Sequence, residues 1–394
     1  MRQPDACPTL DEVPPTIYFD YNATTPLDPA VRDAMLPFLG DVWGNPSSVH
    51  HIGRKARALL DDARDRTAKF LGAKPSEIVF TSGGTESNNL AVLGTARLLK
   101  SKGKHLITSS VEHHAVLHCF DFLENNEGFE VTRLPVDSLG RVSPDDLKLA
   151  IRAETTLVSI MAANNEIGTI QPIPELGAIC RKHGVMFHTD AVQWFGKEPL
   201  QNIAQFHADL VSVCAHKFHG PKGAGLLWIK SPLHPVPASL GGSHENERRA
   251  GTENLAGIIG LVTALEKFVN PPVFDRGKLK PFADKLMAAI DGIDGCELVS
   301  PRENCLSNTV SFVVEGADSI ALLAGLDVEG ICASSGSACS AGSLEPSHVI
   351  VAIGKRALAN SLVRLSLGRE TTMENIDTVC DVLPCVIHRA RFKR

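Results

Sequence analysis

The chain has 394 residues, of which 43% are hydrophobic and 21% charged, so it is long enough for a substantial core in two domains. Its formal net charge is −6 and it has no block of Lys and Arg, which argues against a direct nucleic-acid partner. No apolar run is long enough to cross a bilayer, and residues 1–15 lack the basic-then-apolar order of a signal peptide. We therefore expect a cytoplasmic protein without a membrane partner.

Short β-branched runs alternate with longer amphipathic stretches after an N-terminal tail at residues 1–16. This alternation predicts an α/β fold whose sheet is mostly parallel and covered by helices on both faces. The predicted buried strands lie at residues 76–83, 105–110, 156–163, 185–190 and 208–215, and the predicted helices at 85–103 and 173–184.

The apolar stretch LAGIIGLVTALEKFV at 255–269 predicts a buried helix, and the Pro-containing segment after it indicates a domain boundary. We predict a large domain over 28–268, and a smaller C-terminal α/β domain formed by 17–27 with 269–394. Pro384 lies inside the last helical pattern and should kink or end that helix.

The stretch FTSGGTESNN at 80–89 places two glycines and a threonine, Gly83, Gly84 and Thr85, where a strand meets a helix. Free backbone N–H groups and the helix dipole make such a turn suitable for an anion such as phosphate. An ordinary turn is the simpler alternative. The stretch is neither a Walker A loop nor GxGxxG, so a nucleotide is not predicted.

Two more strand ends carry reactive groups. Lys217 follows an apolar strand, and a lysine there can form a Schiff base, although most lysines are solvated surface groups. Asp190 ends another buried strand, with Gln193 one turn later. Strand carboxyl ends are where open α/β sheets bind ligands, but Asp190 could also cap a helix.

Histidines cluster in SSVEHHAVLHC at 109–119, where His114 and His118 have the i, i+4 spacing of a shared metal site. No third ligand is apparent, so we predict no metal. The ten cysteines form no CxxC pair, and their density is too low for a disulfide scaffold. Reduced thiols are the simpler interpretation.

These single signals strengthen one another in combination. A phosphate turn, an imidazole, a strand-end carboxylate and a lysine follow in order, each after a predicted strand of one sheet. Pyridoxal 5′-phosphate needs an anion site, a Schiff-base lysine and a carboxylate for its ring nitrogen. The sequence therefore predicts this cofactor.

At this point the chain resembles the NifS-like (group I) cysteine desulfurases of the class V aminotransferase family. The resemblance runs from about residue 17 to 375. It rests on the motifs YFDYNATTP, NPSSVHHIGRKA, FTSGGTESNN, NNEIGTIQPI, HTDAVQ, AHKFHGPKG, RRAGTEN, SSGSACSAGSLEPSHV and VRLSLGR. It implies a homodimeric fold-type I enzyme, with a seven-stranded sheet in the large domain, that removes sulfur from L-cysteine to leave L-alanine.

The resemblance also assigns roles to matching residues. Lys217 would hold the cofactor, His113 would stack on its ring and transfer protons, and Asp190 and Gln193 would contact the ring nitrogen and hydroxyl. The implied phosphate ligands are Gly84, Thr85, His216 and, from the partner subunit, this chain's Thr252. The implied ligands of the substrate carboxylate are Asn165, which also belongs to the cofactor site, Arg364 and Asn45.

Cys339 lies in a Gly- and Ser-rich segment, 334–345, that offers nothing to bury a thiol. Beside such a cofactor site we expect it to accept the sulfur as a persulfide and pass it to another protein, because a flexible arm can visit both places. By the resemblance the acceptor serves iron–sulfur cluster assembly or tRNA thiolation. An ordinary exposed thiol is the alternative for an isolated cysteine.

The chain departs from the family pattern in two places. Cys214 stands where the family has a phosphate-binding serine, and a thiol is the poorer donor. Ser243, Asn246 and Glu247 replace Gly, Arg and Gly at the expected dimer-side edge of the site. Three alternatives stay open: a selenocysteine lyase, an aminotransferase of the same fold, and a silent docking platform for iron–sulfur assembly.

Overall fold

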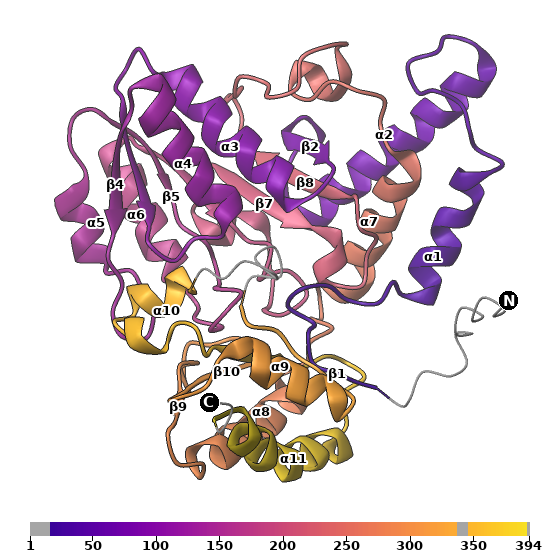
Figure 1. Ribbon diagram of the computed structural model, residues 1–394. Coiled ribbons are helices and arrows are strands. Elements are labelled where there is room, and N and C mark those ends of the chain that lie inside the picture. The colour runs from indigo at the N-terminus through magenta and orange to yellow at the C-terminus, as the bar shows by residue number, and fades with distance from the viewer. Residues whose placement is uncertain (1–15, 337–345, 392–394) are drawn as a thin grey trace, which may run out of the picture.

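The computed structural model describes residues 16–336 and 346–391, which form a larger and a smaller body (Figure 1). The larger body is built on a seven-stranded sheet in the order β2-β8-β7-β6-β5-β3-β4. Strand β8 is antiparallel to both of its neighbours, and the other pairings are parallel. The strands are β2 Ile78–Thr81, β3 His105–Ser109, β4 Glu130–Leu134, β5 Thr155–Ser159, β6 Met186–Asp190, β7 Leu210–Cys214 and β8 Gly225–Ile229. The predicted α/β fold with a mostly parallel seven-stranded sheet is confirmed.

Helices cover both faces of this sheet. Successive side chains of a strand point to opposite faces, and in the central strands the residues on both faces are apolar. Leu106 and Leu157 pack against α3 and α4, whereas Ile107 and Val158 belong to the main core, with residues of α2, α6 and α7. The helices of this body are α1 Pro29–Met35, α2 His51–Leu71, α3 Gly84–Leu99, α4 His114–Glu127, α5 Pro144–Ala150, α6 Ile173–His183 and α7 Leu255–Phe268.

The smaller body has its own hydrophobic core, to which Phe19 and Tyr21 from the start of the described chain contribute. Strands β9 Cys296–Leu298, β10 Thr309–Val314 and β12 Val363–Ser366 form an antiparallel sheet, and β1 Ile17–Tyr18 pairs with β11 Ile331–Cys332. Its helices are α8 Arg276–Asp291, α9 Ser319–Val328, α10 His348–Ala352 and α11 Met373–Arg391. The predicted domain division, 28–268 against 17–27 with 269–394, stays a proposal that this second core supports.

Two further observations concern the helices. Helix α11 continues past Pro384, so that proline does not end it as one reading of the sequence predicted. Leu383, Val386 and Ile387 on either side of the proline are buried in the second core, which holds the helix together. Within residues 16–336 and 346–391, no helix is both long and apolar enough to cross a membrane.

A strained turn follows the sheet at residues 243–247. Glu245, Asn246 and Glu247 have φ angles of 50°, 54° and 61°, in the left-handed region that L-residues other than Asn and Asp rarely adopt. The side chain of Glu245 anchors the turn, because its buried carboxylate accepts bonds from Arg64 at 2.6 and 2.8 Å and from the backbone N–H of Phe80 at 2.9 Å. Glu247 is exposed and stands where the resembling family has glycine.

Replacing Glu247 with glycine should stabilise the protein, because glycine adopts a positive φ without the clash of a Cβ atom. We expect the free energy of unfolding to rise by about 1 kcal/mol relative to Glu247→Ala, which also removes the carboxylate but keeps the Cβ. Urea unfolding of the two variants side by side measures the difference. Equal midpoints for the Gly and Ala variants would show that the turn is not strained at this position.

Candidate active site

A cavity of about 170 Å³ lies at the carboxyl ends of the central strands, where ligands bind in open α/β sheets. Asp190 ends β6, Cys214 ends β7, and the N-terminus of α3 follows β2 at the same edge. The predicted site residues that line this cavity are Gly84, Thr85, His113, Asn165, Asp190, Gln193, His216, Lys217 and Arg364. Segments far apart in the chain thus meet at one cavity.

Lys217 enters the cavity from a single 3₁₀ turn, Ala215–Lys217, that directly follows the buried strand β7. Its Nζ donates to the backbone carbonyls of Asn22 and Ala23, at 2.7 and 2.8 Å. These two acceptors belong to the YFDYNATTP motif, so one role of that motif is to hold the Lys217 amine in the cavity. The amine is held in the cavity and not in solvent, as a Schiff-base lysine requires.

Asp190 is buried, and this burial raises the pKa of its carboxyl. Two hydrogen bonds oppose that rise: Asn88 Nδ2 donates to one oxygen at 2.6 Å, and the backbone N–H of Val192 donates to the other at 3.0 Å. The residues after Asp190 form a turn and not an α-helix, so a helix cap does not account for its carboxylate. A buried carboxylate of this kind suits a protonated ring nitrogen.

His113 caps the N-terminus of α4, where its Nδ1 accepts a hydrogen bond from the backbone N–H of Ala115 at 3.1 Å. Burial, followed by the charge of Lys217, lowers the pKa of His113 to about 4. The ring is therefore neutral near pH 7, and its proton is on Nε2 because Nδ1 acts as an acceptor. A neutral ring can stack on another ring and exchange a proton at Nε2.

Gly84, Thr85 and His216 form the end of the cavity suited to an anion. A Cβ atom at Gly84 would lie 2.8 Å from Val192 Cγ2, so a larger residue at the start of α3 would push against the Val192 side chain. The N-terminus of α3 directs its first backbone N–H groups toward this end, which suits phosphate oxygens. Burial, followed by Lys217, lowers the pKa of His216 to about 3, so this imidazole is neutral as well.

Cys214 belongs to the same end of the cavity. A Cβ at Gly84 would lie 3.6 Å from Cys214 Cβ, so the side chain of Cys214 lies beside the N-terminus of α3. The thiol's hydrogen bond runs to the carbonyl of Ala224 with a sulfur–oxygen distance of 3.9 Å, and burial raises its pKa. The thiol is neutral here, and it is a weaker donor than the serine hydroxyl of the family pattern.

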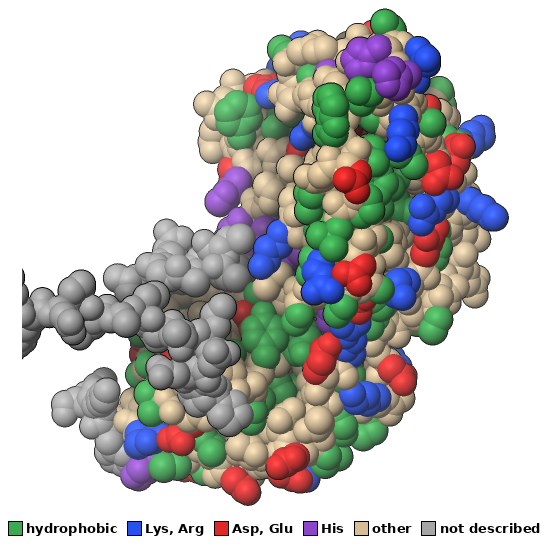
Figure 2. All heavy atoms as spheres, turned by 90° about the vertical axis from the view of Figure 1, so that its right-hand side faces the viewer, with side chains coloured by type: hydrophobic (Ala, Val, Ile, Leu, Met, Phe, Trp, Pro, Cys, Tyr) green, Lys and Arg blue, Asp and Glu red, His purple; other side chains and the backbone are tan. Residues whose placement is uncertain are grey.

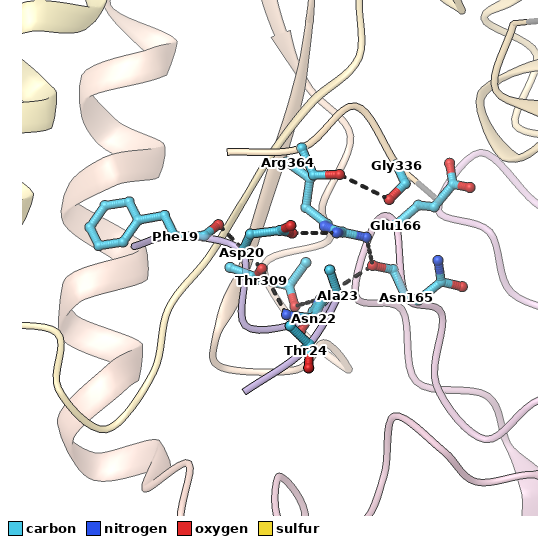
Figure 3. A network of polar contacts seen from close by, with 12 residues as sticks. Phe19, Asp20, Asn22, Ala23, Thr24, Asn165, Glu166, Thr309, Gly336 and Arg364 are labelled. Carbon is cyan, nitrogen blue, oxygen red and sulfur yellow. Dashed lines mark hydrogen bonds and ion pairs between the residues drawn. The ribbon is translucent and has the colours of Figure 1, made fainter. Parts of the chain in front are cut away.

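Arg364 lies on β12 of the smaller body and is only 1% exposed. Its guanidinium donates to Asp20 Oδ1 at 2.7 Å and to the carbonyl of Asn165 at 2.8 Å (Figure 3). Its Nε has no hydrogen-bond partner within the described parts of the chain. A buried donor without an acceptor is costly, so this guanidinium favours a further anionic group such as a carboxylate.

Two predicted site residues of the described chain are not part of this cavity. Asn45 and Thr252 are both exposed and do not line it, so their assignments stay predictions. Cys339 lies outside the described residues. His114 and His118 stack with ring centroids 5.1 Å apart, and no group of three potential metal ligands gathers in the described ranges.

Sequence reasoning missed three residues that shape the site: Asn22, Asn88 and Lys197. Asn88 lies in FTSGGTESNN, one turn into α3, so its helix position gave a usable signal. Lys197 is fully buried after Gln193, and Asn22 bonds to partners from both bodies. Their pairing joins segments 175 residues apart, for which no local pattern exists.

The residues fit pyridoxal 5′-phosphate. The cavity offers a helix N-terminus that a Cβ would fill, a buried carboxylate and a lysine amine within one lining. These are the anion, ring-nitrogen and Schiff-base partners that the cofactor requires. The neutral imidazole of His113 is available for its ring face.

Comparisons with known proteins agree with this geometry. The family model described as aminotransferase class-V matches residues 17–379. The cysteine desulfurase IscS of Dictyoglomus turgidum is 49% identical over 377 residues, covering 95% of each chain. A solved NifS-like protein superimposes with a TM-score of 0.88 at 35% identity, covering 95% of this chain and all of that one. A structure of SspA in complex with cysteine has a TM-score of 0.79 at 38% identity, covering 91% of this chain and all of that one. The chain therefore belongs to the aminotransferase class-V family, among its cysteine desulfurases.

Proposed function

We propose that the protein converts L-cysteine to L-alanine with pyridoxal 5′-phosphate and transfers the sulfur to Cys339 as a persulfide. The observation that carries this proposal is that Lys217, Asp190, His113 and Arg364 line one buried cavity. The relative SspA, which was solved in complex with cysteine, supports the choice of amino acid.

The residues divide the work of holding the cofactor. Lys217 is the Schiff-base partner, Asp190 the acceptor for the ring nitrogen, and Gln193 the contact to the ring oxygen. Gly84, Thr85 and His216 receive the phosphate. When bound, pyridoxal 5′-phosphate supplies an electron sink that weakens the bonds at the substrate's α-carbon.

Arg364 is the residue best placed to receive the substrate carboxylate, with Asn165 and Asn45 as the further proposed ligands. Its bond to Asp20 Oδ1 occupies only part of the guanidinium, and Nε is open. Because the carbonyl of Asn165 also accepts from Arg364, the clamp is fixed in orientation before substrate arrives.

His113 moves protons between substrate atoms, since its neutral ring carries the exchangeable proton on Nε2. The thiolate of Cys339 attacks the substrate sulfur, the bond between that sulfur and Cβ breaks, and the electron pair leaves with carbon. One thiol and one cysteine thus give one persulfide and one alanine, without any external oxidant or reductant.

The described ends of the segment that carries Cys339 both lie beside Glu166. Ser347 Oγ donates to Glu166 Oε2 at 2.6 Å, and a Cβ at Gly336 would lie 2.8 Å from the same oxygen. Glu166 follows Asn165 directly in the chain. This contact supports delivery of the cysteine arm to the substrate-binding edge of the cavity.

A homodimer, with Thr252 reaching the partner's phosphate site, belongs to the same proposal. Large hydrophobic side chains are exposed between α1 and α2, on the side of the molecule drawn in Figure 2, and a second copy would cover them: Leu36, Leu39, Trp43 and Val49. The persulfide sulfur would go to an acceptor protein such as an iron–sulfur scaffold, or to tRNA thiolation, and the proposed location is cytoplasmic.

Incubation of the purified protein with L-cysteine and a reductant should release alanine and sulfide in equal amounts. Cys339→Ala and Lys217→Ala should each lower both products at least 100-fold, because one removes the sulfur acceptor and the other the cofactor's covalent partner. Amino-acid analysis and a sulfide assay measure the two products together.

Alanine without dependence on Cys339 would contradict the persulfide route. Absence of alanine from protein that holds the cofactor would contradict the activity itself. The ratio of kcat/KM for cysteine and selenocysteine separates the desulfurase from the selenocysteine lyase alternative, and pyruvate formation would indicate the aminotransferase.

Replacing Cys214 with serine should tighten cofactor binding, because a hydroxyl donates a stronger hydrogen bond to phosphate than a thiol does. We expect the Kd to fall about three- to tenfold, the equivalent of one ordinary hydrogen bond. Fluorescence titration of the cofactor-free protein measures the Kd, with Cys214→Ala as the matched control that offers no donor. Equal Kd values for the Ser and Ala variants would show that this side chain does not contact the phosphate.

A further inference from the structure

Lys197 is a second lysine beside the cavity, and no role in the proposed reaction accounts for it. It is 3% exposed and lies in the turn that follows β6. No carboxylate forms an ion pair with it within the described residues. The ring of Phe274 lies 5.3 Å from its ammonium and covers one side. Burying a lysine without a carboxylate partner costs free energy of folding, so its polar contacts must compensate for that cost.

The Nζ of Lys197 donates to two side-chain amide oxygens. One is Asn22 Oδ1, at 2.5 Å, and the other is Gln193 Oε1. Asn22 Oδ1 also accepts from Asn308 Nδ2 at 3.0 Å, while Asn22 Nδ2 donates to the hydroxyl of Thr309 at 2.9 Å. The oxygen and nitrogen ends of the Asn22 amide are therefore assigned without ambiguity.

The orientation of the Gln193 amide follows from its partners in the same way. Its Oε1 faces Lys197, which is a donor, so the opposite end of the amide is the NH₂ group. One N–H of Nε2 is used by the carbonyl of Asn22 at 2.9 Å. The second N–H is left for the cavity that Gln193 lines. A flipped amide would set two donors against each other at Lys197 and two oxygens against each other at the Asn22 carbonyl. It would also present an acceptor to the ligand.

We propose that Lys197 is a positioning residue that locks the amide of Gln193 so that a donor N–H faces the ring oxygen of the cofactor. This inference rests on the proposed role of Gln193 as the contact to that oxygen. An N–H donor stabilises the ionised ring oxygen over the protonated one. The ionised oxygen in turn shares less of the proton on the Lys217 nitrogen, which makes that nitrogen more acidic.

The nearby charged groups all lower the pKa of Lys197. Lys217 and Arg364 are the cations that face it, and together with burial they lower its pKa. Across the Phe274 ring lie Tyr21 and His219, at centroid distances of 6.2 and 6.0 Å. The charged ammonium of Lys197 can only donate, so its hold on Gln193 Oε1 is strongest in the protonated form. The bond from Gln193 Nε2 to the Asn22 carbonyl favours the same orientation in either form.

The test uses the visible absorbance of the bound cofactor, which changes when the Lys217 nitrogen gains or loses a proton. In Lys197→Met the midpoint of this pH titration should rise by about one pH unit, because one of the two contacts that hold Gln193 as a donor is lost. Lys102→Met, at an exposed lysine, is the control and should leave the midpoint unchanged. Lys197→Leu, which also removes the donor, serves if the Met variant does not fold and should show the same direction.

A double-substitution cycle separates positioning from simple destabilisation. Gln193→Ala should raise the midpoint by a similar amount, and Lys197→Met added to it should raise the midpoint no further. Additive shifts, or an unchanged midpoint in a Lys197 variant that binds one cofactor per chain, would overturn the inference. Failure of the wild-type protein to bind the cofactor or to form alanine would instead overturn the proposed function.

Discussion

The site depends above all on Asn22, whose peptide and side chain are shared by groups from both bodies. Its carbonyl accepts from Lys217 and from Gln193, and its amide oxygen accepts from Lys197 and from Asn308. Each of these donors is buried or half-buried, so losing the acceptor would leave it unsatisfied at a cost of about 1–3 kcal/mol. The short segment before α1 therefore positions Lys217 and the amide of Gln193, and it connects both to the smaller body through Asn308.

A second constraint is the sign of the buried charges. Lys197, Lys217 and Arg364 face one another around the cavity, and Asp20 and Asp190 are the carboxylates beside them. The positive charges of these three residues repel one another in the low-dielectric interior, so an anion that binds in the cavity relieves that repulsion. A phosphate, an ionised ring oxygen and a substrate carboxylate are the anions that the proposed reaction brings. Binding of the cofactor should accordingly stabilise the fold as well as enable the chemistry.

Much of the fold and of the site could be predicted from the sequence, because strand ends carry their reactive residues next to recognisable strands. Asp190 and Lys217 each follow an apolar run directly, and parallel topology brings such ends together. The network behind them could not be predicted, since Asn22 and Asn308 are 286 residues apart and neither sits in a periodic pattern. Pro384 illustrates a local rule overridden by burial: helix α11 continues because its apolar face is held in the second core.

Arg364 links the two bodies at the cavity. The arginine belongs to β12 of the smaller body, whereas Asn165, whose carbonyl it contacts, follows β5 of the larger one. Asp20 pairs with the same guanidinium and precedes Asn22 by two residues, so a carboxylate bound at Arg364, as proposed, would share that guanidinium with a group of the segment that also holds Lys217. Under these proposed roles, a substrate carboxylate at Arg364 would be coupled through residues 20–23 to the environment of Lys217. The coupling needs no large movement, because the groups concerned already share hydrogen bonds.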